Sequence, residues 1–217
     1  MSSVDVCIES TPKRAFAVAL GWPGWARSGK TEEAAIAALV DYTDRYAVVV
    51  SEAGHDPAAL TAAVHVVERV AGDMTTEFGA PGAIAAADAL PLTAAGAARE
   101  AALVAAAWRV LASTAAASPE ALRKGPRGGG RDRGPMVDHV VGAEAAYARK
   151  LGVRAPKPLP DGADPAELVR LSLLDLLARP SDGTPPREGG WPPRYAARRI
   201  AWHVLDHAWE MADRGTP

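Results

Sequence analysis

The sequence predicts an α+β protein in which a small α+β unit over residues 1–90 precedes an antiparallel four-helix bundle over residues 91–217. Two observations support this division. Short runs with strand-like alternation lie in the first part, whereas long alanine-rich segments with one apolar face fill the second. A length of 217 residues suits one large domain or two small ones, and it allows a substantial buried core.

The first unit is expected to begin with a β-hairpin. Apolar and polar residues alternate over residues 4–9, as in a strand with one buried face, and residues 15–20 form a second apolar run. The intervening segment Thr11-Pro12-Lys13 has the composition of a turn. Trp22 and Trp25 lie in the breaker-rich segment that follows, and we expect them to pack this unit against the bundle.

Two helices and another strand complete the expected first unit. Thr31 can cap a helix whose first turn carries two glutamates, which complement the helix dipole. Residues 46–53 are interpreted as a helix, with a strand at residues 48–50 as the alternative. Residues 62–70 are rich in β-branched side chains and predict a strand, and the glycines and proline of residues 79–82 mark a loop.

Four amphipathic helical segments after Pro91 predict the bundle. Ser118-Pro119-Glu120 has the chemistry of a short extra turn after the first segment, and Asp164 is a suitable cap for the third. Linkers rich in proline and glycine separate the later segments. The four expected helices are Ala94–Ala117, residues 135–151, residues 164–179 and residues 194–214.

Composition excludes several functional classes. A net charge of −2 gives no overall attraction to nucleic acid or anionic membranes, so neither is expected as a partner. No basic region followed by an apolar stretch opens the chain, and the apolar runs are interrupted by charge before they could span a bilayer. The sequence therefore predicts a cytoplasmic protein with a small-molecule substrate, and it leaves a homodimer open.

A histidine pair is the most informative chemical feature. His203 and His207 are four residues apart, so both project from one face of the last expected helix. Each precedes a member of the apolar stripe and should lie at its edge, as does His139 beside Val140. Because Cys7 is the single cysteine, any metal must be held by histidines and carboxylates. The three imidazoles are candidate ligands for zinc, nickel or iron, and ordinary surface or core histidines are the alternative.

Carboxylates close to the histidines in sequence are candidates for orienting a metal-bound imidazole by hydrogen bonding. Asp206 lies between the paired histidines, and Glu144 follows His139 on the same expected helix. Asp138 is a third candidate. No residue of these segments is identified as a catalytic acid, base or nucleophile.

Residues 91–214 resemble the DinB/YfiT-like family of metal-dependent enzymes. The resemblance is carried by the stretches MVDHVVGAE, residues 136–144, and IAWHVLDH, residues 200–207. It implies a four-helix bundle in which His139, His203 and His207 bind a divalent metal, commonly zinc or nickel. It also implies activity with a low-molecular-weight thiol as cofactor or co-substrate, through S-transfer to an electrophile or isomerisation, and thiol transfer ranks ahead of hydrolysis.

Residues 16–34 are similar to the strand–turn–helix start of HicB-like antitoxin domains. The similarity is carried by the runs FAVAL, WPGW and GKTEEA. It implies a small sheet paired with a helix. The alternative to an enzyme is therefore a non-catalytic binding or antitoxin-like stress module, in which the histidines hold a structural metal or none.

Candidate substrate-binding residues lie before two of the expected helices. Five basic residues and one acidic residue occupy the glycine-rich residues 123–133, which could clamp an anion near the metal or form only a solvated loop. Aromatic residues before the last helix could line an apolar pocket or supply core bulk. These candidates are Arg127, Arg131, Arg133, Trp191 and Tyr195.

Overall fold

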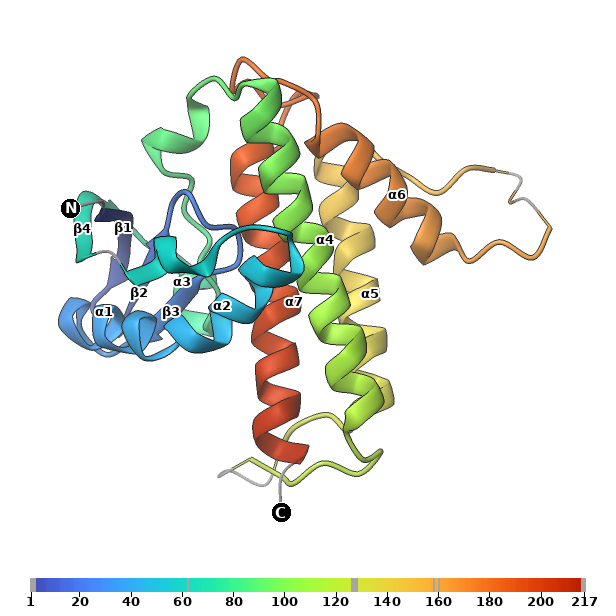
Figure 1. The fold of residues 1–217 in the computed structure, drawn as a ribbon, viewed down its shortest axis with the longest axis horizontal. Helices are drawn as coiled ribbons and strands as arrows, with labels where there is room; N and C mark the ends of the chain where they lie inside the picture. The colour runs from blue at the N-terminus through green and yellow to red at the C-terminus, as the bar shows by residue number, and fades with distance from the viewer. Residues whose placement is uncertain (1–2, 62, 126–128, 158, 160, 216–217) are drawn as a thin grey trace.

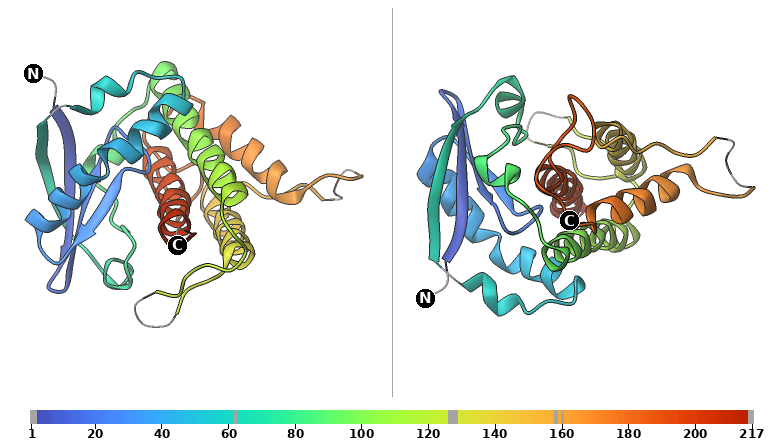
Figure 2. Two further views of the ribbon diagram at one scale, coloured as in Figure 1. Left: turned by 60° about the horizontal axis from the view of Figure 1, so that its bottom comes forward. Right: turned by 90° about the horizontal axis from the view of Figure 1, so that it is seen from above.

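The computed structural model describes residues 3–61, 63–125, 129–157, 159 and 161–215. Within them the α+β class is confirmed: seven α-helices accompany one four-stranded sheet. The sheet and the first three helices lie on one side of the molecule, and four longer helices lie on the other (Figure 1). Figure 2 shows the last helix, α7, between the sheet and the remaining long helices.

The sheet has the strand order β3-β2-β1-β4, with β4 parallel to β1 and the other pairs antiparallel. The predicted hairpin is present as β1 and β2, and residues 63–71 form the predicted later strand. β3 was not expected, because its sequence ARSG has no apolar alternation that would indicate a strand. The strands are Ser3–Thr11 (β1), Arg14–Ala19 (β2), Ala26–Gly29 (β3) and Ala63–Ala71 (β4).

Three helices belong to the sheet side. α1, Glu32–Asp41, is capped as predicted by Thr31, whose side chain accepts a hydrogen bond from the Ala34 backbone N–H. α2, Thr43–Glu52, confirms the helical interpretation of residues 46–53, and it buries Tyr46 completely. The short helix α3, Met74–Phe78, was not predicted from the sequence.

The four long helices each bury one face. α4 has the predicted bounds, whereas residues 118–120 form no helical turn. Asp164 caps α6 by accepting a hydrogen bond from the Ala166 backbone N–H. The helices are Ala94–Ala117 (α4), Arg133–Lys150 (α5), Pro165–Leu177 (α6) and Pro193–Gly215 (α7).

The expected antiparallel arrangement holds for α5 against α7 and is wrong for α4 against α7. Arg194, at the start of α7, forms an ion pair with Glu100 near the start of α4. At the other end, Gly215 lies against Ser118, so the two helices run in the same direction. The physical reason is the length of chain between the end of α5 and the start of α6, because a crossover between helices two and three allows the first and fourth to be parallel.

The hydrophobic core is continuous across residue 91, joining the sheet side to the bundle. Trp25 stacks on Tyr46 with ring centroids 5.3 Å apart, and Phe16 of β2 meets Trp202 of α7 edge to face at 6.0 Å. Gly24 has a φ of +94°, and a Cβ there would lie 2.6 Å from Cδ1 of Leu205. The turn after β2 therefore packs directly on α7, as predicted for the segment that contains Trp22 and Trp25.

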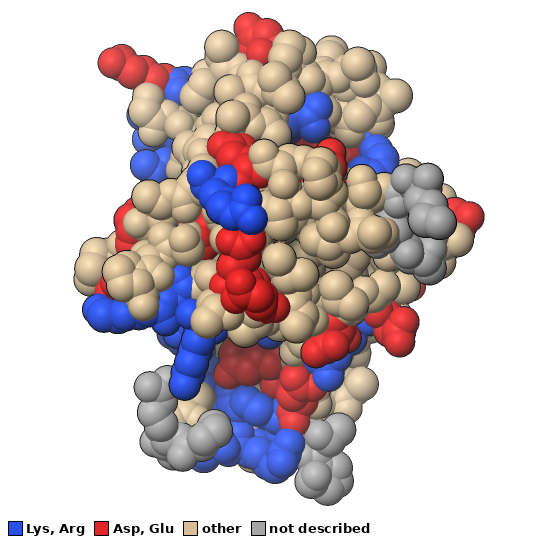
Figure 3. All heavy atoms as spheres, turned by 90° about the vertical axis from the view of Figure 1, so that its left-hand side faces the viewer, with Lys and Arg blue, Asp and Glu red and all other residues tan. Residues whose placement is uncertain are grey.

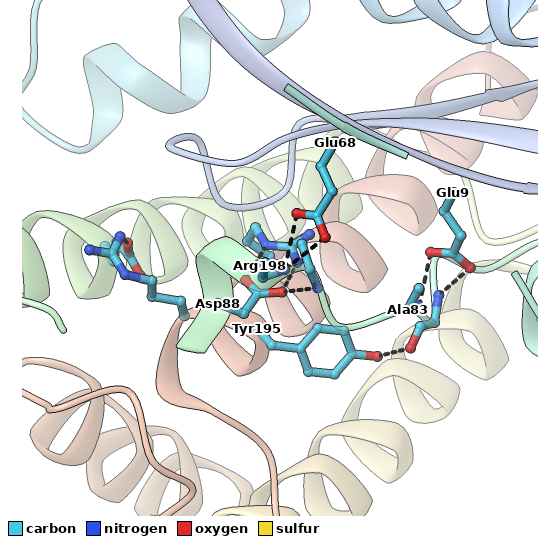
Figure 4. Close-up of polar contacts among 11 residues, drawn as sticks. Glu9, Glu68, Ala83, Asp88, Tyr195 and Arg198 are labelled. Carbon is cyan, nitrogen blue, oxygen red and sulfur yellow. Dashed lines mark hydrogen bonds and ion pairs between the residues drawn. The ribbon is translucent and has the colours of Figure 1, made fainter. Parts of the chain in front are cut away.

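The segment between α3 and α4 is held by polar contacts to both sides (Figure 4). Glu9 of β1 accepts hydrogen bonds from the backbone N–H groups of Gly82 and Ala83, each at 2.9 Å. Arg198 of α7 forms a buried, two-bond ion pair with Asp88. These contacts hold the part of α7 that comes before its histidines in a fixed position relative to the sheet.

α4 is the one helix among the described residues that is long and apolar enough to cross a membrane, with a mean hydropathy of 1.2. It packs against α2, α6 and α7. Leu103, Trp108 and Leu111 are among its buried residues. A helix in the core of a folded domain meets the same criterion of length and composition.

Candidate metal centre

The structure brings His139, His203 and His207 together. α5 contributes the first and α7 the other two, and one ring nitrogen of each lies within 4.8 Å of the others. The Nε2 atoms of His139 and His203 are 3.3 Å apart. Two ligands about 2.0–2.1 Å from a tetrahedral zinc ion would be separated by roughly 3.3–3.4 Å, so this spacing fits a shared metal.

The cluster lies at the edge of the α5–α7 contact, as the apolar stripes predict. Val140 and Val204, each adjacent to a histidine, are fully buried between the helices. His203 is 8% exposed, whereas His139 and His207 are half-buried. The rings meet edge to face, with centroids 4.7 to 5.1 Å apart. His203 is thus the most enclosed of the three, and His139 and His207 are partly exposed.

Glu210 fixes the orientation of His207. Its Oε2 atom lies 3.1 Å from Nδ1 of His207, one turn further along α7. The hydrogen bond with His207 and the contact with Arg214 hold the pKa of the Glu210 carboxyl below its usual range. Since an ionised carboxylate only accepts hydrogen bonds, Nδ1 of His207 is the donor in this contact.

Two histidines are held in the neutral form. Burial lowers the pKa of His203 to about 2, with further lowering by His207 and Arg199. Burial also lowers the pKa of His139, and the nearby Arg131 adds to the effect. Neutral imidazoles have the lone pairs that metal ligation requires. Nδ1 of His203 is buried and has no hydrogen-bond partner among the described residues, so this ring is oriented by packing.

The carboxylates expected to orient the histidines bond elsewhere. Asp206 forms an ion pair with Arg27 of β3 at 3.0 Å. The Glu144 side chain is buried between α4 and α6. It accepts a hydrogen bond from Trp108 and forms an ion pair with Arg170. Asp138 is exposed. The orienting role belongs instead to Glu210, which the sequence interpretation missed although its three-residue spacing from His207 on a helix would have indicated contact.

Aromatic residues form one wall of the centre. The Tyr147 ring lies 5.6 Å from that of His203 and 5.2 Å from that of Trp191. Trp191 is thus linked to His203 through the Tyr147 ring, and its role in substrate binding stays a prediction. Tyr195 does not line the centre with its hydroxyl, because this group donates a hydrogen bond to the Gly82 carbonyl at 2.9 Å (Figure 4).

Arg199 is a second site residue that the sequence interpretation missed. It lies one turn before His203 on α7. Its guanidinium carbon is 5.3 Å from the Tyr147 ring centroid and 4.9 Å from that of Trp202. The cation lies close enough to the centre to lower the pKa of His203.

The arginines of the basic loop before α5 have different roles. Arg133 forms an ion pair with Glu120 at 2.9 Å and donates a hydrogen bond to the Ser118 carbonyl, so it fastens the end of α4. Arg131 is exposed and acts electrostatically on His139 and His203. Arg127 lies outside the described residues. Basic side chains also gather at the lower end of the face in Figure 3, whereas acidic and basic groups are interspersed above it.

No family model matches the chain, and searches of curated proteins and of solved structures return no significant match. The similarities to DinB/YfiT-like and HicB-like proteins therefore stay predictions based on short motifs. Function has to be inferred from the geometry of the three histidines and the residues around them.

Proposed function

We propose that this chain is a divalent-metal-dependent enzyme whose His139, His203 and His207 bind zinc or nickel. The nucleophile is a small thiol or water, and S-transfer to a small electrophile ranks ahead of hydrolysis. The single observation that carries the proposal is the convergence of three ring nitrogens within 4.8 Å, with two of them at the 3.3 Å spacing of neighbouring metal ligands.

The donor set supports a divalent cation. Burial favours the neutral form of His139 and His203, whose lone pairs can bind a metal, and the Glu210 carboxylate contacts Nδ1 of His207. When bound by three protein nitrogens, a divalent metal has a position free for a thiol or water and lowers the pKa of that ligand. Nickel and zinc both accept imidazole ligands, so the donor set is compatible with either ion.

The chain's own residues would serve this chemistry in distinct ways. Glu210 holds His207 in one orientation, and the side chain of Arg214 pairs with the same carboxylate at 2.7 Å. The Tyr147 ring covers one side of the centre, where it would limit the entry of water, and Trp191 packs against Tyr147.

The alternative is a non-catalytic binding or antitoxin-like module. One observation favours it. The 3.3 Å between the Nε2 atoms of His139 and His203 also suits a hydrogen bond between these two imidazoles without any metal. In that case the histidines would stabilise the contact between α5 and α7.

Metal analysis of protein purified without a histidine tag separates the two functions. The enzyme proposal predicts about one zinc or nickel ion per chain, loss of that ion in His203→Ala, and a helical spectrum that is retained in the variant. His65→Ala is the matched control, because this histidine is exposed on β4. Protein that binds neither ion would contradict the proposal, and protein that unfolds when the metal is chelated would indicate a structural role.

A further inference from the structure

A groove that contains none of the three histidines lies between α5 and α6. α6 is inclined to α5 (Figure 1), and residues of both helices and of the chain that follows α5 line a cavity of about 730 Å³. Small-molecule sites have volumes of about 300–1,000 Å³, so this cavity is large enough for a ligand. We call it the α5–α6 groove.

Short aliphatic side chains form most of the walls of the groove. Because the alanines of α5 and α6 that line it are small, they leave space between the two helices. Val153 and Ala155 pack against the hydrophobic core, and the Val153 backbone N–H donates a hydrogen bond to the Ala148 carbonyl at 2.9 Å. The chain that follows α5 is therefore anchored where it lines the groove. The aliphatic lining includes Val141, Ala145, Val153, Ala155, Ala166 and Val169.

Three basic side chains also line the groove. Arg149, Arg154 and Lys157 are all exposed, and among the described residues none of them forms an ion pair. A single exposed cation is ordinary, because water solvates it. Three cations beside one apolar cavity match a molecule with an anionic end and a nonpolar part, since the cavity can bury the nonpolar part.

The two carboxylates of the lining already have partners. Glu144 is 2% exposed, and it accepts hydrogen bonds from Trp108 at 2.6 Å and from Nε of Arg170 at 2.8 Å. Asp164 caps α6 by accepting a hydrogen bond from the Ala166 backbone N–H. Because Arg170 compensates the charge of Glu144, the three cations of the lining outweigh the remaining carboxylate. The charge of the groove therefore favours an anion over a cation.

We propose that the α5–α6 groove binds a small amphipathic anion, an aliphatic chain that ends in a carboxylate or a phosphate. The chain lies against the valines and alanines, and the anionic group lies among Arg149, Arg154 and Lys157. Each methylene group that leaves water strengthens binding roughly fourfold. Since no histidine lines the groove, this binding is independent of the proposed metal centre.

Isothermal titration calorimetry of the chelated, metal-free chain measures the binding. Octanoate and octyl phosphate are the two test ligands. Butyrate has the charge without the long chain, 1-octanol has the chain without the charge, and octylammonium has the chain with the opposite charge.

Two variants test the two parts of the groove. Ala145→Trp fills the apolar part, and Ala112→Trp, at an exposed position of α4, is its control. The double variant Arg149→Gln with Arg154→Gln removes two of the cations. Its control is Arg109→Gln with Arg179→Gln, since both arginines are exposed and neither lines the groove.

At least one of octanoate and octyl phosphate should bind the wild type about ten times more tightly than 1-octanol, octylammonium or butyrate. The ligand that binds more tightly identifies the anionic group. Ala145→Trp should lose this binding, and the Arg149→Gln, Arg154→Gln chain should bind about five times more weakly than its control. His203→Ala should bind the anion as the wild type does.

Four results would overturn the inference. The first is that neither anion binds the wild type, and the second is that 1-octanol or octylammonium binds as tightly as both anions. The third is an unchanged affinity in a folded Ala145→Trp chain or in the double arginine variant. The fourth is a loss of binding in His203→Ala, because this would place the anion at the histidines.

Discussion

Glu210 accepts a hydrogen bond from Nδ1 of His207 across 3.1 Å, and the same ring contributes a nitrogen to the cluster with His139 and His203. In the proposed metal centre, a carboxylate at Nδ1 would leave Nε2 of His207 as the ligand atom. A contact of this kind outside the ligand set raises the basicity of the imidazole and fixes its plane.

Glu210→Gln should weaken zinc affinity about 10- to 100-fold, because the amide fixes the imidazole less firmly and removes the negative charge. The measurement is a competitive titration of zinc against a coloured chelator. Glu167→Gln is the matched control, since this glutamate is exposed on α6. Equal zinc affinity in both variants would show that Glu210 does not support the centre.

Acid should destabilise the metal-free chain through His203. The folded-state pKa of His203 is about 2, whereas the unfolded chain has the usual value near 6.5. Between these values the unfolded state binds a proton that the folded state does not, so stability falls as pH decreases. From pH 7 to pH 5 the expected loss is about 2 kcal/mol in the free energy of unfolding.

Urea unfolding of chelated protein at several pH values measures this loss. His203→Asn should show a smaller loss between pH 7 and pH 5, because asparagine does not titrate. His65→Asn, at an exposed position, should retain the wild-type dependence. Identical slopes for wild type and His203→Asn would refute the contribution of this histidine.

Gly24→Ala should destabilise the contact between the sheet side and α7. The new Cβ would lie 2.6 Å from Leu205 and 3.2 Å from the backbone of Ala201, and the φ of +94° is unfavourable for alanine. We expect a loss of about 2–4 kcal/mol on chemical denaturation. Gly21→Ala is the control in the same turn, because a Cβ there would meet nothing within 4 Å. Equal stability of the two variants would contradict the packing at Gly24.

Arg198→Met should cost about 3–5 kcal/mol in the free energy of unfolding, since it leaves Asp88 buried without its cation. Replacing both partners, as Arg198→Met with Asp88→Leu, should recover most of this loss because no buried charge is left unpaired. Chemical denaturation of the three chains gives the comparison. A double variant no more stable than Arg198→Met would argue against a charge-based origin.

Sequence patterns predicted those elements whose start and end depend only on residues close by in the chain. The cap at Thr31 and the bounds of α4 follow from residues within one or two helical turns. The edge-of-stripe positions of His139, His203 and His207 also follow from helical periodicity, which is why their convergence could be expected before the structure.

Features that depend on distant residues could not be predicted in this way. Asp206 was expected to orient a histidine, but its partner Arg27 comes from β3, a strand that the sequence did not indicate. The parallel course of α4 and α7 depends on the crossover between α5 and α6, which no local pattern indicates. Arg199 was missed because its buried Nη1, which has no hydrogen-bond partner among the described residues, is visible only when its surroundings are known.

The central claim is that three histidines of this chain share one metal ion. X-ray absorption spectroscopy of the zinc-loaded, tag-free protein measures the ligands directly. The proposal predicts about three imidazole nitrogens at about 2.0–2.1 Å from zinc, decreasing to two or to no bound zinc in His203→Ala. A wild-type spectrum without three imidazoles, or an unchanged imidazole count in His203→Ala, would contradict the claim.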